Sequence, residues 1–188
     1  MTVAEYKEVL KTRLNEKRYH HSLCVANEAA RLATLYGGDK DKMYLAGLLH
    51  DITKNISDEE QLQLLKKFDI MLSCAEKASP QIWHAITGAL LLEHEFGITD
   101  PDILSAVRYH TTGKEGMSKA EKIVYMADLT SADRNYSDVE DIRAAVNISL
   151  DEGIIRVLKF TIPNLISRGL VVHPDTLNAY NELVIKMK

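Results

Sequence analysis

Cysteine is scarce in this sequence, which has only Cys24 and Cys74 among its 188 residues. The two do not form a CxxC pair, so we expect no disulfide framework and a reducing, cytoplasmic location. Long apolar runs are also missing: no stretch reaches ~18 residues, and the opening MTVAEYKEVL has no hydrophobic segment. The sequence therefore predicts neither a signal peptide nor a membrane span.

An excess of positive charge is missing as well, since the formal net charge is -4. Because an acidic surface repels nucleic acid and anionic membranes, we expect neither of them as a partner. Local cations can still hold a phosphate ligand. The glycine-containing segment YGGDKDK, however, lacks the order Gly, four residues, Gly-Lys-Ser/Thr that defines a phosphate-binding loop.

Signals for helix starts and stops are abundant. A Ser or Thr followed three residues later by Glu can form a capping box, in which side chains and backbone N–H groups satisfy each other. Four such pairs are Thr2 with Glu5, Ser57 with Glu60, Ser118 with Glu121, and Ser137 with Glu140. Two further starts carry proline at the first helical position, at Pro80 and Pro101, and glycines mark stops.

These signals predict helices along almost the whole chain. Their expected ranges are 3–13, 20–36, 40–50, 58–68, 80–96, 101–110, 119–132, 138–168 with a break near Gly153, and 174–187. The segment GLVVH at 169–173 is the only short candidate for a strand. A chain of this length without a linker or repeat is predicted to form a single all-α domain built as a helical bundle.

Five polar residues stand out because each lies at the margin of a helical face that should point inward. On five different predicted helices, they are His21, His50, His84, His110 and Asp128. One such histidine alone is usually a hydrogen-bonded core residue, but five positions on five helices indicate a common centre. A buried aspartate is costly unless it is paired or bound to a metal. The pattern predicts a buried cation, and we expect His20 and His94 to lie outside it.

His50 and Asp51 are adjacent, at the end of the apolar stretch LAGLLHD. Successive residues on a regular helix point about 100° apart, so both side chains reach one ion easily only where a helix ends. The next residues, DITKN, are typical of the end of a helix. Mixed imidazole and carboxylate ligands suit iron, manganese, zinc or cobalt, and their spacing alone does not select one of these metals.

The order His, then His-Asp, then Asp on successive helices resembles the HD-domain superfamily of metal-dependent phosphohydrolases. Longer segments resemble the YqeK-type symmetrical bis(5'-nucleosyl)-tetraphosphatase family of bacteria, and these are RYHHSLCVA, AGLLHDITKN, HAITGALL, YHTTGKEGMSKAEKIVYMADLTSADR and YNEL. The resemblance covers residues 18–182 and implies a single HD domain over 1–188. It implies a metal-binding core at 18–135 and C-terminal helices at 138–187 that complete the substrate pocket.

The resemblance implies hydrolysis of diadenosine tetraphosphate to two ADP by a metal-activated water. It implies iron as the usual metal, and the ligands would be His21, His50, Asp51 and Asp128. The family has its first histidine directly before Ser-Leu, which selects His21 over His20, and His21 is also expected to contact substrate. The resemblance leaves room for a second metal ion and for a homodimer.

His84 and His110 match positions that hold phosphates or a second metal ion in related HD enzymes. We assign them first to phosphates and polarised water, and second to a metal. Asp51 is expected to double as a base for the attacking water, and His84 or His110 to protonate the leaving ADP oxygen. The sequence does not separate these catalytic roles.

Cationic and polar side chains are expected around the phosphates, because phosphoryl transfer depends on positioning and charge stabilisation. Lys54 follows the His-Asp pair and Arg134 follows Asp128, which makes these two the first candidates, with Lys114 a weaker one. Thr111 lies where a helix ends, so its hydroxyl group could contact phosphate. A plain helix exit accounts for that threonine almost as well.

The segment HPDTLNAY places His173 at the start of the last helix. Free N–H groups and the positive end of the helix dipole suit a phosphate or a ribose there, although simple capping is an equal alternative. The resemblance favours a nucleotide contact, so His173 and Thr176 are included as substrate-binding residues.

Two other functions are consistent with the same residues. A regulatory module would hold a nucleotide in this pocket without turning it over, although a pure binding protein has less need of an intact ligand set. An HD hydrolase with another nucleotide substrate is the other alternative. Release of ADP from diadenosine tetraphosphate separates the first alternative from the enzyme, and a substrate panel separates the second.

Overall fold

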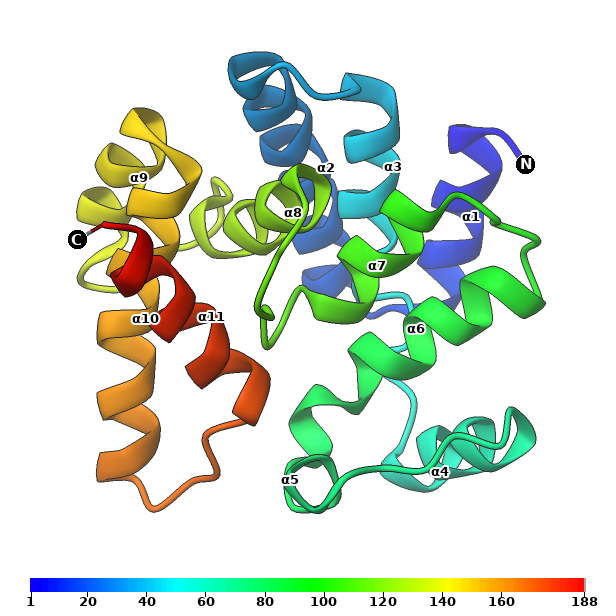
Figure 1. The fold of residues 1–188 in the computed structure, drawn as a ribbon. Helices are drawn as coiled ribbons and strands as arrows, with labels where there is room; N and C mark the ends of the chain where they lie inside the picture. Colours follow the sequence, from blue (N-terminus) through cyan, green and yellow to red (C-terminus); the bar gives the residue numbers. More distant parts are fainter. Residues whose placement is uncertain (188) are drawn as a thin grey trace.

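The computed structural model describes residues 1–187 and is built from helices (Figure 1). Within this part of the chain there are eleven α-helices, one short 3-10 helix and no strand. In chain order they are α1 (Val3–Arg13), α2 (Glu16–Tyr36), α3 (Lys40–Leu49), α4 (Asp58–Lys67), α5 (Cys74–Lys77), η1 (Pro80–Ile82), α6 (Trp83–His94), α7 (Pro101–Tyr109), α8 (Lys119–Thr130), α9 (Val139–Ile148), α10 (Leu150–Ser167) and α11 (Pro174–Lys186). The predicted all-α class is confirmed.

Most predicted helix starts are present, with their caps. The boxes at Thr2, Ser57 and Ser118 form with both reciprocal hydrogen bonds. The box predicted at Ser137 is wrong, because α9 is preceded by Asp138, whose side chain makes no capping hydrogen bond. A box that we did not predict, from Ser73, begins the short helix α5.

Two other predictions about helix boundaries are wrong. Helix α2 begins at Glu16 rather than at residue 20, because Asn15 accepts the N–H of Arg18 and caps it. The break in the region 138–168 falls at Ser149, whose backbone is extended and whose hydroxyl accepts the N–H of Glu152. Gly153 lies inside α10, and a Cβ there would come within 2.9 Å of the Val146 Cβ. That glycine therefore permits close helix packing and does not break the helix.

The short strand candidate at 169–173 does not form a strand, as the all-α prediction requires. Gly169 has a φ of +65°, and the segment that follows is the irregular connection between α10 and α11. Figure 1 shows this connection at the end of the α10–α11 pair, away from the neighbouring helices. With no second strand to pair with, the segment has no partner for its backbone hydrogen-bonding groups in a sheet.

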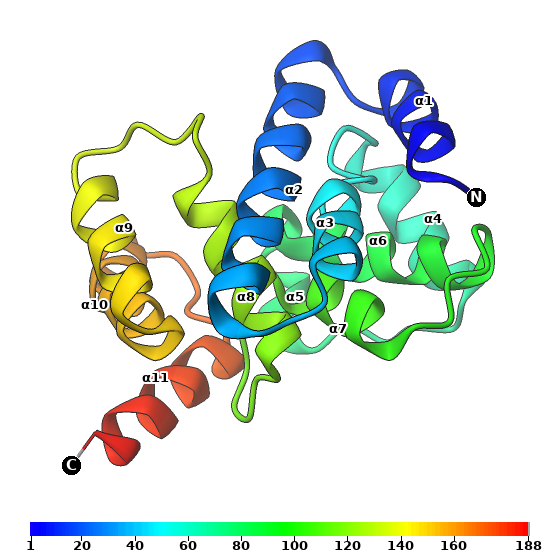
Figure 2. The same cartoon turned by 90° about the horizontal axis from the view of Figure 1, so that it is seen from above.

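The core lies where α2, α3, α7 and α8 meet. Helix α8 packs against α2, α3 and α7, and the helices α9 and α10 flank it on one side (Figures 1 and 2). Fully buried side chains from three of these helices fill the centre, and they include Leu32, Leu48, Leu49, Ile123 and Met126. No helix within residues 1–187 has both the length and the apolar character needed to cross a bilayer.

Gly47 permits the close approach of α2 and α3. A Cβ at this position would lie 3.0 Å from the Ala29 Cβ and 3.0 Å from the Val25 carbonyl oxygen. We expect Gly47→Ala to lower the free energy of unfolding by about 1–3 kcal/mol, the usual cost of overpacking. Denaturant unfolding followed by circular dichroism measures this change.

The matched control for this prediction is Gly88→Ala in α6. A Cβ there would meet its nearest neighbour at 3.5 Å, an ordinary contact. Both substitutions gain about 1 kcal/mol of helix propensity. The difference between the two variants therefore isolates the packing cost, and equal stabilities would show that α2 and α3 can move apart freely.

Candidate metal centre

Six buried or nearly buried histidine and aspartate side chains converge from five helical regions. His21 comes from α2, His84 from α6 and Asp128 from α8, whereas His50 and His110 are the C-caps of α3 and α7. Asp51 follows His50 in the turn after α3, so the pair does lie at a helix end as predicted. Because helix ends and helix faces meet here, residues far apart in the sequence face one point.

The four predicted metal ligands lie within reach of a common centre. His21 Nε2 is 2.9 Å from Asp128 Oδ1, and His50 Nε2 is 3.2 Å from Asp51 Oδ2 and 3.9 Å from Asp128 Oδ1. The ligand atoms of His21, His50 and Asp51 all lie within 4.8 Å of one another. Asp128 forms a similar group with His50 and His110, so His50 joins Asp128 to the other three predicted ligands.

A second group shares Asp51. The other carboxylate oxygen of this residue, Oδ1, lies 3.1 Å from His84 Nε2 and 3.7 Å from His110 Nε2. The ligand atoms of Asp51, His84 and His110 also lie within 4.8 Å of one another. Asp51 therefore stands between two clusters and presents one oxygen to each.

The hydrogen bonds of the rings fix where their lone pairs point. His50 Nδ1 donates to the Gly47 carbonyl at 2.7 Å, and His110 Nδ1 donates to the Val107 carbonyl at 2.7 Å. Because a carbonyl only accepts, Nδ1 carries a hydrogen in both rings, and Nε2 is left free to hold a metal ion or a second proton. His50 Nε2 is buried, has no hydrogen-bond partner and faces two carboxylates. Two carboxylates facing this nitrogen need a cation between them, either a proton on Nε2 or a metal ion, so the residues fit a metal ion.

His84 has the opposite arrangement. Asp51 Oδ1 lies 3.1 Å from His84 Nε2, and since a carboxylate only accepts, Nε2 carries the hydrogen. Lys54 Nζ lies 3.1 Å from Nδ1 and 3.3 Å from Nε2. Burial lowers the pKa of His84 to about 4, so the ring is neutral at pH 7. This tautomer suits donation to an oxygen better than ligation of a metal.

Both aspartates are ionised. Burial by itself would raise the pKa of Asp51, but His50, His110 and His84 outweigh it and hold the pKa well below its ordinary value. Burial likewise opposes ionisation of Asp128, yet the hydrogen bond from His21 and the charge of Arg134 keep its pKa low. Two charged carboxylates inside a protein need cations nearby.

Three cationic side chains border the centre. Arg134 donates to Asp128, as expected from its position in the sequence, and Lys54 adjoins His84. Arg18 was not among the predicted site residues, yet its Nη1 lies 2.8 Å from Asp51 Oδ2. The available signal was its place three residues before His21, on the same face of α2. Lys114 pairs with Glu121 at 3.3 Å.

The first turn of α11 lies beside the end of α7. Thr176 donates to the Thr112 carbonyl at 2.9 Å, two residues beyond His110. His173 caps α11 by accepting the N–H of Asp175 through Nδ1, and its Nε2 is buried without a partner. The Thr111 hydroxyl is also buried without a partner. Unpartnered polar atoms near the centre are typical of places where a ligand binds.

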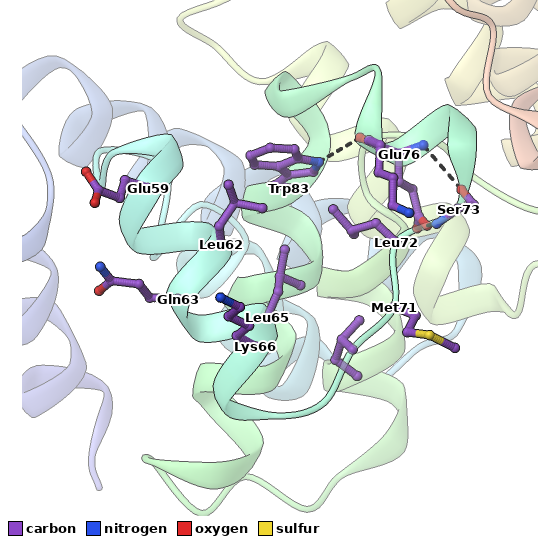
Figure 3. Close-up of a pocket in the computed structure, with 12 residues that line it drawn as sticks. Glu59, Leu62, Gln63, Leu65, Lys66, Met71, Leu72, Ser73, Glu76 and Trp83 are labelled. Atoms are coloured by element: carbon purple, nitrogen blue, oxygen red, sulfur yellow. Dashed lines mark hydrogen bonds between the residues drawn. The ribbon is translucent and has the colours of Figure 1, made fainter.

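The remaining histidines lie outside the cluster. His20 is exposed, and His94 stacks on Phe68 with ring centroids 4.4 Å apart. A hollow of about 970 Å³ between α4 and α5 contains none of the six clustered residues (Figure 3). It borders Trp83, whose indole N–H donates to the Glu76 carbonyl at 2.7 Å. This bond anchors the start of α6, where the next residue is His84.

A helical bundle that gathers histidines and aspartates in the order His, His-Asp, Asp defines the class of HD-domain proteins, and the chain belongs to this family, whose HD domain model matches residues 18–133. Within the class, it belongs with the symmetrical bis(5'-nucleosyl)-tetraphosphatases. The protein of that name from Staphylococcus aureus is 37% identical over 96% of this chain and 94% of the relative. The one from Bacillus subtilis is 36% identical over 93% of this chain and 94% of the relative.

A solved structure agrees with the fold. It is described as a predicted HD superfamily hydrolase involved in NAD metabolism, from Clostridium acetobutylicum. Its TM-score with this chain is 0.96 at 32% sequence identity, covering 99% of this chain and 98% of the other. Membership in the HD family implies dependence on a divalent metal, and the cluster of histidines and aspartates is where such a metal would bind.

Proposed function

We propose that this protein hydrolyses diadenosine tetraphosphate symmetrically, giving two molecules of ADP in the bacterial cytoplasm. The observation that carries the proposal is the buried, unpartnered Nε2 of His50 facing the carboxylates of Asp51 and Asp128. The names of the relatives point to the substrate. A protein that only binds nucleotides would have little use for such a costly arrangement.

The proposed metal is iron, held by His21, His50, Asp51 and Asp128. When bound, such a cation lowers the pKa of a water and polarises a phosphoryl oxygen. The alternative position for a second ion is between Asp51, His84 and His110. The hydrogen-bonding of His84 favours its role as a donor to phosphate over its role as a ligand.

Arg18, Lys54 and Arg134 are proposed to bind the phosphates. The arginine side chains are each 31% exposed, so N–H groups not used on Asp51 or Asp128 can face an incoming anion. The protein has a net charge of -4, and a chain of four phosphates brings several more negative charges. Local cations are therefore required to offset the repulsion.

The C-terminal helices are proposed to complete the substrate pocket. His173 and Thr176 begin α11, which meets the segment after α7 through Thr176 and Thr112. The unpartnered Nε2 of His173 and hydroxyl of Thr111 can bond a ribose or a phosphate. In this arrangement α11 holds the nucleoside end of the substrate while the histidine cluster holds the phosphates.

Proton transfer is assigned to Asp51, His84 and His110. The attacking water forms the new P–O bond and gives its proton to Asp51, and the bridging P–O bond breaks as one ADP leaves. His84 or His110 takes this proton from Asp51 and passes it to the leaving oxygen, and their Nε2 atoms are 3.1 Å apart, so the two rings can share one proton. Both rings are buried, which keeps bulk water out of this exchange.

The test is turnover of diadenosine tetraphosphate by protein loaded with iron or manganese, with separation of the nucleotide products. We expect ADP as the only product, and no turnover after removal of the metal with a chelator. Formation of ATP and AMP would contradict symmetrical cleavage. Binding of diadenosine tetraphosphate without any product would favour the regulatory nucleotide-binding module. Faster hydrolysis of another nucleotide would show that diadenosine tetraphosphate is not the preferred substrate.

A further inference from the structure

We propose that Asp133 is a positioning residue that holds the His21 ring in the orientation needed to bind the metal. This inference rests on the metal site proposed above and adds a residue outside the predicted ligand set. Asp133 comes from the connection between α8 and α9, and its Oδ2 lies 2.7 Å from His21 Nδ1. The two residues are 112 positions apart in the sequence.

Both carboxylate oxygens of Asp133 are engaged. Oδ2 accepts from His21, and Oδ1 accepts the hydroxyl of Ser131 at 2.7 Å. Ser131 is the C-cap of α8, the helix that carries Asp128. The carboxylate is therefore tied to the end of the same helix that supplies another proposed ligand, so His21 and Asp128 are positioned through one element.

His21 differs from His50 and His110 in the partner of its Nδ1 atom. His50 and His110 donate from Nδ1 to backbone carbonyls three residues earlier, at the ends of their own helices. His21 lies inside α2, where the carbonyls of the preceding turn already accept backbone N–H groups. An outside acceptor is needed, and the one present is an anion, which increases the basicity of the opposite ring nitrogen.

Asp133 is not placed to bind the same metal ion as His21 Nε2. His21 Nε2 faces Asp128 at 2.9 Å, whereas Asp133 is bonded to Nδ1, on another edge of the ring. Binding of a metal through Nε2 requires the ring hydrogen to be on Nδ1, and Asp133 is placed to accept that hydrogen. Asp133 thus favours the tautomer of His21 that binds a metal, as well as the ring's orientation.

The experiment measures Co²⁺ binding to the full chain by its visible absorption, with a competing chelator for tight binding. We expect Asp133→Ala to bind Co²⁺ about 10 to 100 times more weakly than the original protein. In Asp133→Asn the amide oxygen can still accept from His21, and the amide NH₂ can donate to Ser131. We expect this variant to recover much of the affinity, with a shifted absorption spectrum because the charge is gone.

The control is Asp138→Asn, which changes an exposed aspartate on the same connection whose side chain caps nothing. It should bind Co²⁺ like the original protein. Thermal unfolding of each variant shows whether the fold persists, and if Asp133→Ala does not fold, Asp133→Asn decides the question through its spectrum and affinity.

The possible failures are distinguishable. If the original protein binds no Co²⁺, the proposed metal site fails, whatever Asp133 does. If the original protein binds Co²⁺ and folded Asp133→Ala binds it equally tightly, Asp133 has no positioning role. An unchanged affinity and spectrum in Asp133→Asn, where Asp133→Ala cannot be measured, would also overturn the inference.

Discussion

Asp51→Ala is expected to abolish metal binding and to reduce turnover of diadenosine tetraphosphate by at least about 10³-fold. Asp51 presents Oδ2 to His50 and Oδ1 to His84, so its loss removes an oxygen from both clusters. The fold should survive, because the Arg18 side chain freed by the substitution is 31% exposed and can reach water. Metal analysis of the purified variant, turnover and thermal unfolding give the three measurements.

Asp102→Ala is the matched control for this prediction. Asp102 is a surface carboxylate that pairs with Lys42, remote from the histidine cluster. The control should keep its metal and its turnover. Retained turnover with metal still bound in Asp51→Ala would mean that the site has been assigned to the wrong residues.

Arg18→Ala is expected to lower kcat/KM by about 10²-fold, the usual effect of removing one charged donor from a developing negative charge. The variant should keep its metal content, because Arg18 contacts the Asp51 carboxylate and is not itself a ligand. Arg18→Lys keeps the charge but loses the fork of N–H donors, so partial recovery is expected. Steady-state kinetics over a range of substrate concentrations measures both variants.

The control for Arg18 lies on the same helix. Arg31 is also in α2, and it pairs with Glu28 at the surface. Arg31→Ala should leave kcat/KM unchanged. If Arg18→Ala were as active as Arg31→Ala, the phosphates would have to be held by Lys54 and Arg134 without it. Loss of metal from Arg18→Ala would instead show that the arginine supports the ligand Asp51.

Helix ends were predictable where the cap is local. The boxes at Thr2, Ser57 and Ser118 each involve residues three positions apart, so no other part of the chain is needed to form them. The starts of α5 and α10, which we did not predict at their observed residues, also had local signals, because Ser73 and Ser149 are each followed by Glu three residues later. The Ser137 pattern failed because α9 begins after Asp138 instead.

The sequence predicted which polar residues would be buried together, but not the contacts that each of them makes. Polar residues at the margin of apolar helical faces must be buried when those faces pack, so His21, His50, His84, His110 and Asp128 were expected to meet. The roles of their neighbours were not readable in this way. The packing of α2 against α3 brings Arg18 to Asp51, and the packing of α2 against α8 brings Asp133 to His21.

The amino-acid sequence by itself determined where the helices lie and which of their faces are apolar, because capping and periodicity depend on residues within one or two turns. The tertiary structure decided which atoms meet. It placed the two oxygens of Asp51 toward two different clusters and put an anionic partner behind His21. Those contacts depend on the angles and distances between packed helices, which arise from the whole core and are not encoded in any local pattern.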